Sequence, residues 1–170
     1  MSTHGVAITV PEPYGSMLQQ ARERAGDPLA NFIPPHVTLL PPTEIEKADL
    51  AGFEKHLGEV ASRHSPFRMH LHGTGTFRPL SPVVFVQVSV GIPQCELLET
   101  DVRSGPVVRD LEFNYHPHVT IAHNIDEEAL DRAFEDVEEF RCAFEVRSFE
   151  LYHQGDDGVW RPLTSFPLEG

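Results

Sequence analysis

Short hydrophobic segments predict β-strands along the whole chain. In some of them hydrophobic and polar positions alternate, and others are continuous and bounded by glycine and proline. The most β-prone run is residues 83–90 (VVFVQVSV). Residues 36–40 are expected to form a strand that Pro41-Pro42 ends, because proline lacks the amide hydrogen that a sheet uses. Further strands are expected at residues 5–10, at 67–71, from 140 through 151, and in the last stretch, which holds Phe166 and Leu168. Residues 73–75 and 155–158 are typical of turns.

Between these strands, hydrophobic residues recur at the spacing of a helix. Two such stripes, with members three or four positions apart, predict helices, and two more helices are expected at residues 16–25 and 94–103. The stripes consist of Leu50, Phe53, Leu57 and Val60, and of Leu130, Phe134 and Val137. Thr43 with Glu46 and Asn124 with Glu127 have the spacing of capping boxes, so we expect them to begin the two striped helices.

The order of these elements repeats along the chain. In each half a strand is followed by a capped acidic helix and then by a strand that begins with Phe-Arg, at Phe67-Arg68 and again at Phe140-Arg141. Such a duplication predicts two lobes of sheet and helix, related by an approximate two-fold axis and facing each other across a groove. We expect residues 1–170 to form one bilobal domain.

The triplet His-Val-Thr occurs twice, at His36-Val37-Thr38 and at His118-Val119-Thr120, each time after a proline. In an extended segment residues two apart share a face, so each triplet offers one imidazole beside one hydroxyl. The two-fold relation would bring His36 and His118 to opposite sides of the groove. Two groups that titrate near neutral pH, together with two neutral hydrogen-bond donors, are what metal-free cleavage of a phosphodiester requires.

The charge of the chain limits the size of a substrate. Thirteen basic and 26 acidic side chains give a net charge of −13, and no stripe of Lys and Arg is available to bind a long nucleic acid. A phosphorylated substrate is therefore expected to be small, or to be the end of a strand. Local positive charge could come from Arg78, Arg103, Arg109 or Arg141, although each of them has the alternative interpretation of an ordinary surface arginine.

No feature of the sequence indicates a membrane or an oxidising compartment. No apolar run approaches the roughly 20 residues of a bilayer span, and the first residues lack the pattern of a signal peptide. Cys95 and Cys142 have no metal-ligand spacing and are expected to be reduced and partly buried. We therefore expect a cytoplasmic protein. The sequence leaves the oligomeric state open.

The two triplet segments resemble the motif strands of a known family. Residues 33–42 (IPPHVTLLPP) and 116–122 (HPHVTIA) are similar to those of the 2H phosphoesterase superfamily, specifically its 2′-5′ RNA ligase-like and cyclic phosphodiesterase branch. The resemblance in element order extends from Val6 to Leu168. It implies a bilobal α+β fold of antiparallel sheets with outer helices, and a site between the lobes that uses neither metal nor cofactor. It also implies action on 2′,3′-cyclic phosphates or 2′-5′ linked nucleotides.

The same resemblance implies roles for the four triplet residues. His36 and His118 correspond to the catalytic pair, and Thr38 and Thr120 to the hydroxyls that bind phosphate. By analogy with the family, His118 is the base and His36 the acid during hydrolysis. The reverse reaction would join ends, as a 2′-5′ RNA ligase does.

Two alternatives remain open from the sequence. In the first, His116 and His118 bind a transition metal together with His123 or His36, although no Asp or Glu accompanies them on these strands. In the second, the protein binds a phosphorylated nucleotide without cleaving it.

Other aromatic residues receive weaker interpretations. His116 shares a face with His118 and is expected at the rim of the site, whereas His123 falls on the opposite face and is expected to be structural. His70 and His72 are expected to face solvent. Tyr152, His153 and Trp160 are candidates for stacking on a base, or are ordinary core and edge residues.

Overall fold

The computed structural model describes the whole chain, residues 1–170, as two antiparallel four-stranded sheets with four helices. The α+β fold expected from the sequence is confirmed. The strands are β1 (Ser2–Thr9), β2 (His36–Ile45), β3 (Phe67–Thr76), β4 (Val83–Val90), β5 (His118–His123), β6 (Arg141–Val146), β7 (Ser148–Gln154) and β8 (Trp160–Pro167). The helices are α1 (Tyr14–Ala25), α2 (Lys47–Ser62), α3 (Ile92–Arg103) and α4 (Glu127–Asp136).

Each motif strand lies at the edge of its sheet. The strand order is β2-β1-β7-β8 in one sheet, sheet A, and β5-β4-β3-β6 in the other, sheet B, and every pairing is antiparallel. The two edge strands β2 and β5 contact each other. This arrangement brings His36, the first residue of β2, and His118, the first residue of β5, to the junction of the sheets.

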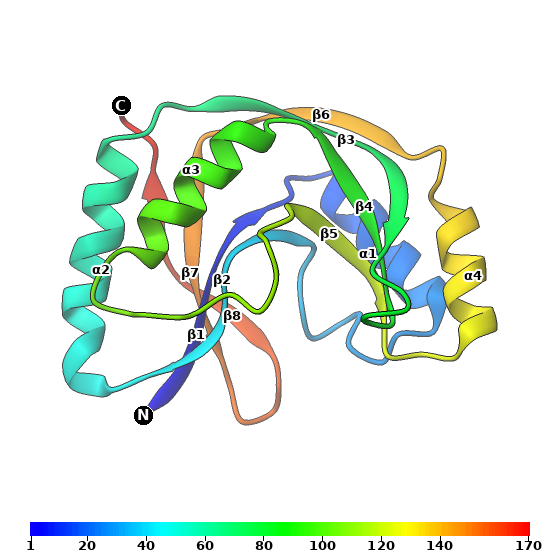
Figure 1. Cartoon of the computed structure of the whole chain (residues 1–170), viewed down its shortest axis with the longest axis horizontal. Helices are drawn as coiled ribbons and strands as arrows, with labels where there is room; N and C mark the ends of the chain where they lie inside the picture. Colours follow the sequence, from blue (N-terminus) through cyan, green and yellow to red (C-terminus); the bar gives the residue numbers. More distant parts are fainter.

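The helices pack in a pattern that crosses between the sheets. Helix α1 leads into β2 but packs on β5 and α4, and α3 leads into β5 but packs on β2 and α2. Consequently α2 and α3 lie at one side of the molecule with sheet A, in what we call lobe A (Figure 1). Helices α1 and α4 lie at the other side with sheet B, in lobe B. The exchange of α1 and α3 obeys the approximate two-fold relation.

The lobes are not the two halves of the sequence. Strands β3 and β4, from the first half, belong to sheet B, and β7 and β8, from the last quarter, return to sheet A. The first Phe-Arg segment begins β3, and the second ends at Arg141, the first residue of β6. These two strands pair with each other, with His72 opposite Arg141. The expected strand over residues 140–151 accordingly divides at Arg147, because β6 and β7 belong to different sheets.

Hydrophobic residues of both lobes form the core. One cluster of 36 buried residues includes Phe53 and Leu57 of α2, Leu130 of α4, Val86 of β4 and Phe149 of β7. The helical stripes expected from the sequence are therefore largely confirmed, and β4 has the expected bounds. None of the helices has the length and apolarity needed to cross a lipid bilayer.

The edge position of β2 explains why the expected break at Pro41-Pro42 is wrong. The strand continues through both prolines to Ile45, and residues 41 and 42 together lie opposite Gly5, in an irregularity of the pairing between β1 and β2. A bulge in an edge strand tolerates residues that cannot donate a hydrogen bond.

The expected turn at residues 73–75 is also wrong. β3 runs on to Thr76, with Gly73 at a positive φ of 86° in a bulge. Gly75 has a different role: a Cβ atom there would lie 2.5 Å from the ring of Phe85, so only glycine allows this ring to cover the strand. The turn at residues 155–158 is present.

Both expected helix caps shift to another residue. Thr43 lies inside β2, and α2 begins after Glu46 without a side-chain cap. In α4 the cap is Asp126, whose side chain accepts a hydrogen bond from the backbone N–H of Ala129. Asn124, at a φ of 63°, precedes the helix by too many residues to cap it.

Candidate active site

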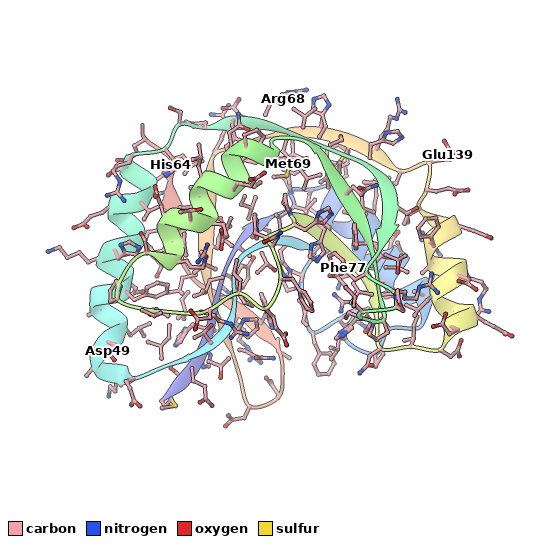
Figure 2. The ribbon with its side chains drawn as sticks, viewed as in Figure 1. Asp49, His64, Arg68, Met69, Phe77 and Glu139 are labelled. Atoms are coloured by element: carbon pink, nitrogen blue, oxygen red, sulfur yellow. The ribbon has the colours of Figure 1, made fainter.

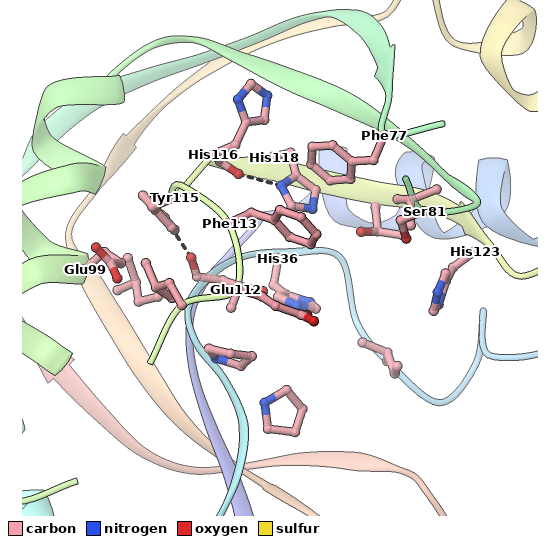
Figure 3. A pocket seen from close by; sticks show the side chains of 18 of the residues that line it. His36, Phe77, Ser81, Glu99, Glu112, Phe113, Tyr115, His116, His118 and His123 are labelled. Atoms are coloured by element: carbon pink, nitrogen blue, oxygen red, sulfur yellow. Dashed lines mark hydrogen bonds between the residues drawn. The ribbon is translucent and has the colours of Figure 1, made fainter. Parts of the chain in front are cut away.

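A cavity of about 1070 Å³ lies between the two motif strands. Its lining includes all four residues singled out from the triplets: His36 and Thr38 from β2, and His118 and Thr120 from β5. In Figure 3 the rings of His36 and His118 enter the same cavity from opposite strands. The structure therefore brings together residues that the sequence places in separate repeats.

The period-two pattern of an extended strand orients the triplet side chains. In each triplet the central valine, Val37 or Val119, is completely buried, and the histidine and threonine on either side are half-buried. The valines anchor the strands in the core, where each buried side chain contributes roughly 1.5–3 kcal/mol. The imidazole and the hydroxyl of each triplet therefore point together away from the core.

Backbone carbonyl groups fix the orientation of both imidazoles. The Nδ1 atom of His36 donates to the carbonyl oxygen of Pro34 at 2.7 Å, and Nδ1 of His118 donates to that of His116 at 2.6 Å. Because a carbonyl oxygen only accepts, each ring carries its hydrogen on Nδ1 when neutral. The lone pair is therefore on Nε2, and no protein group bonds to this atom in either ring. Each Nε2 is available to a substrate.

Aromatic side chains enclose both rings. The ring of His36 stacks on Trp160, with centroids 4.7 Å apart, and His118 meets the edge of Phe77 and the ring of Phe85, each at 5.0 Å. In Figure 2 Phe77 lies between the two lobes, whereas Asp49 and Glu139 mark their outer sides. These aromatic contacts cover part of each imidazole, and both histidines are half-buried.

This environment lowers the pKa of both histidines. Burial lowers the pKa of His36 from 6.5 to about 4; the charges of Arg22 and His118 act in the same direction, and the bond to Pro34 opposes them. Burial also lowers the pKa of His118, with a further contribution from His116. Both imidazoles are therefore neutral near pH 7 in the free protein.

The loop between α3 and β5 forms one wall of the cavity. The hydroxyl of Tyr115 donates to the carbonyl oxygen of Thr38 at 2.7 Å, and Nη1 of Arg109 donates to that of Pro42, so the loop is attached to β2 at two points. Burial raises the pKa of Tyr115, which keeps its hydroxyl protonated as a donor. Phe113, from the same loop, is exposed and lines the cavity.

Of the four arginines considered from the sequence, only Arg109 lines the cavity. Arg78 binds Glu127 and Asp131 outside it, Arg103 pairs with Glu99, and Arg141 contacts His72 on the surface. Of the two interpretations open for these residues, a source of local positive charge or an ordinary arginine outside the site, the structure supports the second for the other three. Their partners are distant in the sequence or lie one helical turn away, and the composition gives no sign of them.

Two buried charged residues in the cavity were not expected. Arg22 is 6% exposed and Glu99 is 3% exposed, and they come from α1 and α3, the helices that exchange lobes. One signal was present for Arg22: it lies four positions after Leu18, on the buried face of its helix. A charged residue at such a position is rare unless it is paired.

His116 and His123 both line the cavity. For His123 this is a correction. Thr120 pairs with Phe85 and Ala122 with Val84, so Ile121 is an extra residue in β5, and the strand beyond it turns its other face to the cavity. The ring of His116 packs against Phe77 and Phe85, which fits the expected position at the rim.

The structure contains no set of ligands for the metal site that the sequence left open. No group of three or more His, Cys, Asp or Glu side chains is arranged to hold a metal ion, so His116, His118, His123 and His36 do not converge on one point. Cys95 and Cys142 are free and buried, and burial raises the pKa of both thiols.

Comparison with known proteins agrees with the fold and the motifs. Residues 10–158 match the model of the 2′-5′ RNA ligase superfamily. The chain therefore belongs to this superfamily, the 2H phosphoesterases, and this membership supports a hydrolase.

Relatives of known sequence carry the description "Putative phosphoesterase". "Putative phosphoesterase BH1439" of Halalkalibacterium halodurans is 29% identical over 167 residues, which are 97% of this chain and 96% of that protein. A protein with the same description from Bacillus thuringiensis (strain Al Hakam) is 27% identical over 146 residues, 84% of this chain and 83% of that protein.

Solved structures share the fold at lower identity. TT0787 of Thermus thermophilus superposes with a TM-score of 0.70 at 22% identity, over 99% of this chain and 98% of that chain. LigT of E. coli complexed with 3′-AMP gives 0.62 at 20% identity, over 99% of each chain. LigT has also been crystallised with NADP⁺ and with ATP.

Proposed function

We propose that this protein is a metal-independent phosphodiesterase that hydrolyses 2′,3′-cyclic phosphates or 2′-5′ linkages of a small nucleotide or an RNA end. One observation carries the proposal: two imidazoles, each with its Nδ1 hydrogen bonded to a carbonyl group and its Nε2 free, line one cavity together with two threonine hydroxyls. Both catalytic groups are thus held in the tautomer that acid-base chemistry at Nε2 needs.

The chemistry requires one imidazole on each side of the phosphorus atom. One Nε2 accepts a proton from water as it attacks, and the other donates a proton to the ribose oxygen that leaves. Each such transfer contributes roughly 10²- to 10⁴-fold to the rate. The hydroxyls of Thr38 and Thr120 would donate to the non-bridging oxygens as negative charge builds there.

The lowered pKa values place a condition on this mechanism. With both histidines neutral, the general acid lacks its proton in the free protein near pH 7. A bound phosphodiester carries negative charge, which favours a protonated imidazole nearby and raises its pKa. We therefore propose that the substrate itself makes the acid competent. We retain His118 as base and His36 as acid for hydrolysis, with the roles exchanged if the enzyme ligates ends.

The properties of the cavity favour a small substrate. Its volume matches that of a nucleotide-sized ligand, and its lining includes the acidic residues Glu99, Asp110 and Glu112. With a net charge of −13, these carboxylates disfavour a long polyanion. The small nucleotides crystallised with LigT, 3′-AMP, NADP⁺ and ATP, support the same substrate class. We further propose that the protein acts in the cytoplasm.

A substrate panel assayed in EDTA tests the proposal. The panel comprises nucleoside 2′,3′-cyclic phosphates, 2′-5′ linked dinucleotides and oligonucleotides with cyclic ends. We expect turnover of at least one class without metal, and loss of at least about 100-fold in His36→Ala and in His118→Ala. His72→Ala, an exposed histidine on β3, is the matched control and should retain full activity. Activity that disappears with EDTA, or wild-type rates in either cavity variant, would contradict the proposal.

The panel also distinguishes catalysis from binding alone. If calorimetry detects nucleotide binding and no product forms on long incubation with any member of the panel, the protein is a binding protein and the catalytic proposal fails.

A further inference from the structure

Arg22 is a buried cation in the cavity that also holds His36 and His118. Its side chain is 7% exposed, it lines the cavity, and its charge is one of the causes that lower the pKa of His36. Burying a charge is unfavourable unless it is paired or used. The partners of each guanidinium nitrogen therefore indicate whether Arg22 is only paired or is also free to bind a ligand.

Asp27 fixes the orientation of this guanidinium group. Its Oδ2 atom accepts from Nε of Arg22 at 2.9 Å and from the backbone N–H of His123 at 3.0 Å, and its Oδ1 accepts from the N–H of Leu29 at 2.9 Å. The carboxylate is thus fully used and nearly inaccessible, at 4% exposure. Through Oδ2, Asp27 connects Arg22 to the end of β5, where His123 is the last residue.

The far side of the guanidinium group remains unused. Only Nε has a protein partner, whereas Nη1 and Nη2 form no hydrogen bond with the protein and are not among the fully enclosed polar atoms. Since Arg22 lines the cavity and its Nε is engaged by Asp27, we infer that these two nitrogens face the open space. Ion pairs between arginine and a carboxylate frequently use two nitrogens of the guanidinium group, whereas Asp27 uses only Nε. The side of the group that carries Nη1 and Nη2 is therefore left for the cavity.

We propose that Arg22 binds the phosphate group of the substrate through Nη1 and Nη2, and so supplies the positive charge that the two threonine hydroxyls cannot. This inference rests on the proposed function and adds a charged contact to it. The planar fork of a guanidinium matches two oxygens of a phosphate, and Arg22 already lies in a built and nearly buried site. In a chain with a net charge of −13, such a contact offsets the repulsion that an anionic substrate meets.

Arg24 provides a matched control on the same helix. It lies two positions further along α1, is 55% exposed, and pairs with Asp136 on the outside of the molecule. Arg22→Gln and Arg24→Gln remove the same charge from the same helix, so they affect overall electrostatics alike. Only the first removes a donor from the cavity.

The test measures binding of inorganic phosphate and of adenosine 2′-monophosphate by NMR titration, following the ring resonances of His36 and His118. We expect Arg22→Gln to weaken binding of both probes by roughly 10-fold or more, as for the loss of a hydrogen bond to a charged group. Arg22→Lys should recover part of the loss, and Arg24→Gln should bind like the wild type. Binding by folded Arg22→Gln within two-fold of the wild type would overturn the inference.

Two provisions keep the test decisive. Arg22→Gln leaves the Asp27 carboxylate buried without its partner, which destabilises the fold; Arg22→Gln/Asp27→Asn replaces the pair by neutral amides and is used if the single variant does not fold. Because the probes are not turned over, the result is independent of catalysis. A protein that binds phosphate through Arg22 and hydrolyses nothing refutes the proposed function alone, whereas normal turnover with unchanged binding in Arg22→Gln refutes this inference alone.

Discussion

The imidazole of His36 stacks on the indole of Trp160, with ring centroids 4.7 Å apart and planes inclined by 30°. The two residues come from opposite ends of the chain, and they meet because β7 and β8 return to sheet A beside β1 and β2. Trp160 was a candidate for stacking on a base. In the structure it is 7% exposed, and its ring packs between His36 and the ring of Tyr152, whose centroid is 5.7 Å away.

This contact predicts a specific effect of changing Trp160. Trp160→Ala should admit water to the His36 ring, raise its pKa toward 6.5, and lower kcat by about 10-fold through looser positioning. NMR titration of His36 and steady-state kinetics on a cyclic phosphate measure both effects. Trp160→Phe keeps an aromatic wall and is the control, with a pKa near that of the wild type. An unchanged pKa in a folded Trp160→Ala would show that the indole does not set the environment of His36.

The dependence of kcat/KM on pH is expected to be bell-shaped, with its maximum below pH 6.5. The rate needs one neutral and one protonated imidazole, and since the pKa values of both are lowered in the free protein, this form is most populated on the acidic side. The kcat profile should lie at higher pH, because the bound phosphate favours the protonated ring. A kcat/KM maximum above pH 7 would contradict this account.

Stability should also depend on His36 between pH 6.5 and about 4. In that range the unfolded chain binds a proton that the folded chain excludes, so the free energy of unfolding falls as the pH is lowered. The lowered pKa corresponds to a contribution of at most about 3 kcal/mol to the free energy of unfolding. This contribution is fully present above pH 6.5. Urea unfolding of wild type and His36→Gln across this range measures it, with His72→Gln as control. If the free energy of unfolding changed equally with pH in all three proteins, this would argue against a neutral, enclosed His36.

Substrates with an activated leaving group separate the acid from the base. A nucleoside p-nitrophenyl phosphodiester releases an anion that needs no proton, so the general acid becomes dispensable. If His36 is the acid, the factor by which His36→Ala reduces the rate should be at least 10-fold smaller on this substrate than on a cyclic phosphate. The factor for His118→Ala should be the same on both substrates. Rescue of His118→Ala instead would reverse the assignment.

We also propose that residues 1–170 fold as one domain, since one buried cluster of 36 residues draws on both sheets. Calorimetry should show a single transition whose calorimetric and van't Hoff enthalpies agree. Two separate transitions would indicate that the lobes fold independently.

The sequence predicts the residues of the site better than their surroundings. His36, Thr38, His118 and Thr120 follow from period-two strands and from the repeat, which are local properties of the chain. Val37 and Val119, completely buried, show why the pattern is reliable: a strand shifted by one residue would expose them and bury the histidines.

What surrounds the four residues depends on packing between distant segments. Arg22 reaches the cavity because α1 crosses to lobe B, and His123 reaches it because β5 has an extra residue at Ile121. Phe77 and Phe85 can enclose His118 because Gly75 leaves room for the Phe85 ring. Apart from the position of Arg22 on the buried face of α1, these arrangements have no signature in a single sequence.

The most direct test of the two-histidine site is a double-mutant comparison on one 2′,3′-cyclic phosphate, in EDTA. His36→Ala, His118→Ala and the double variant are measured by turnover rate, with folding checked by circular dichroism. If the two imidazoles act as a unit, each single variant loses at least about 100-fold, and the double variant loses little more than either one. Wild-type turnover in a folded single variant, or losses that multiply in the double variant, would show that the histidines do not share one reaction.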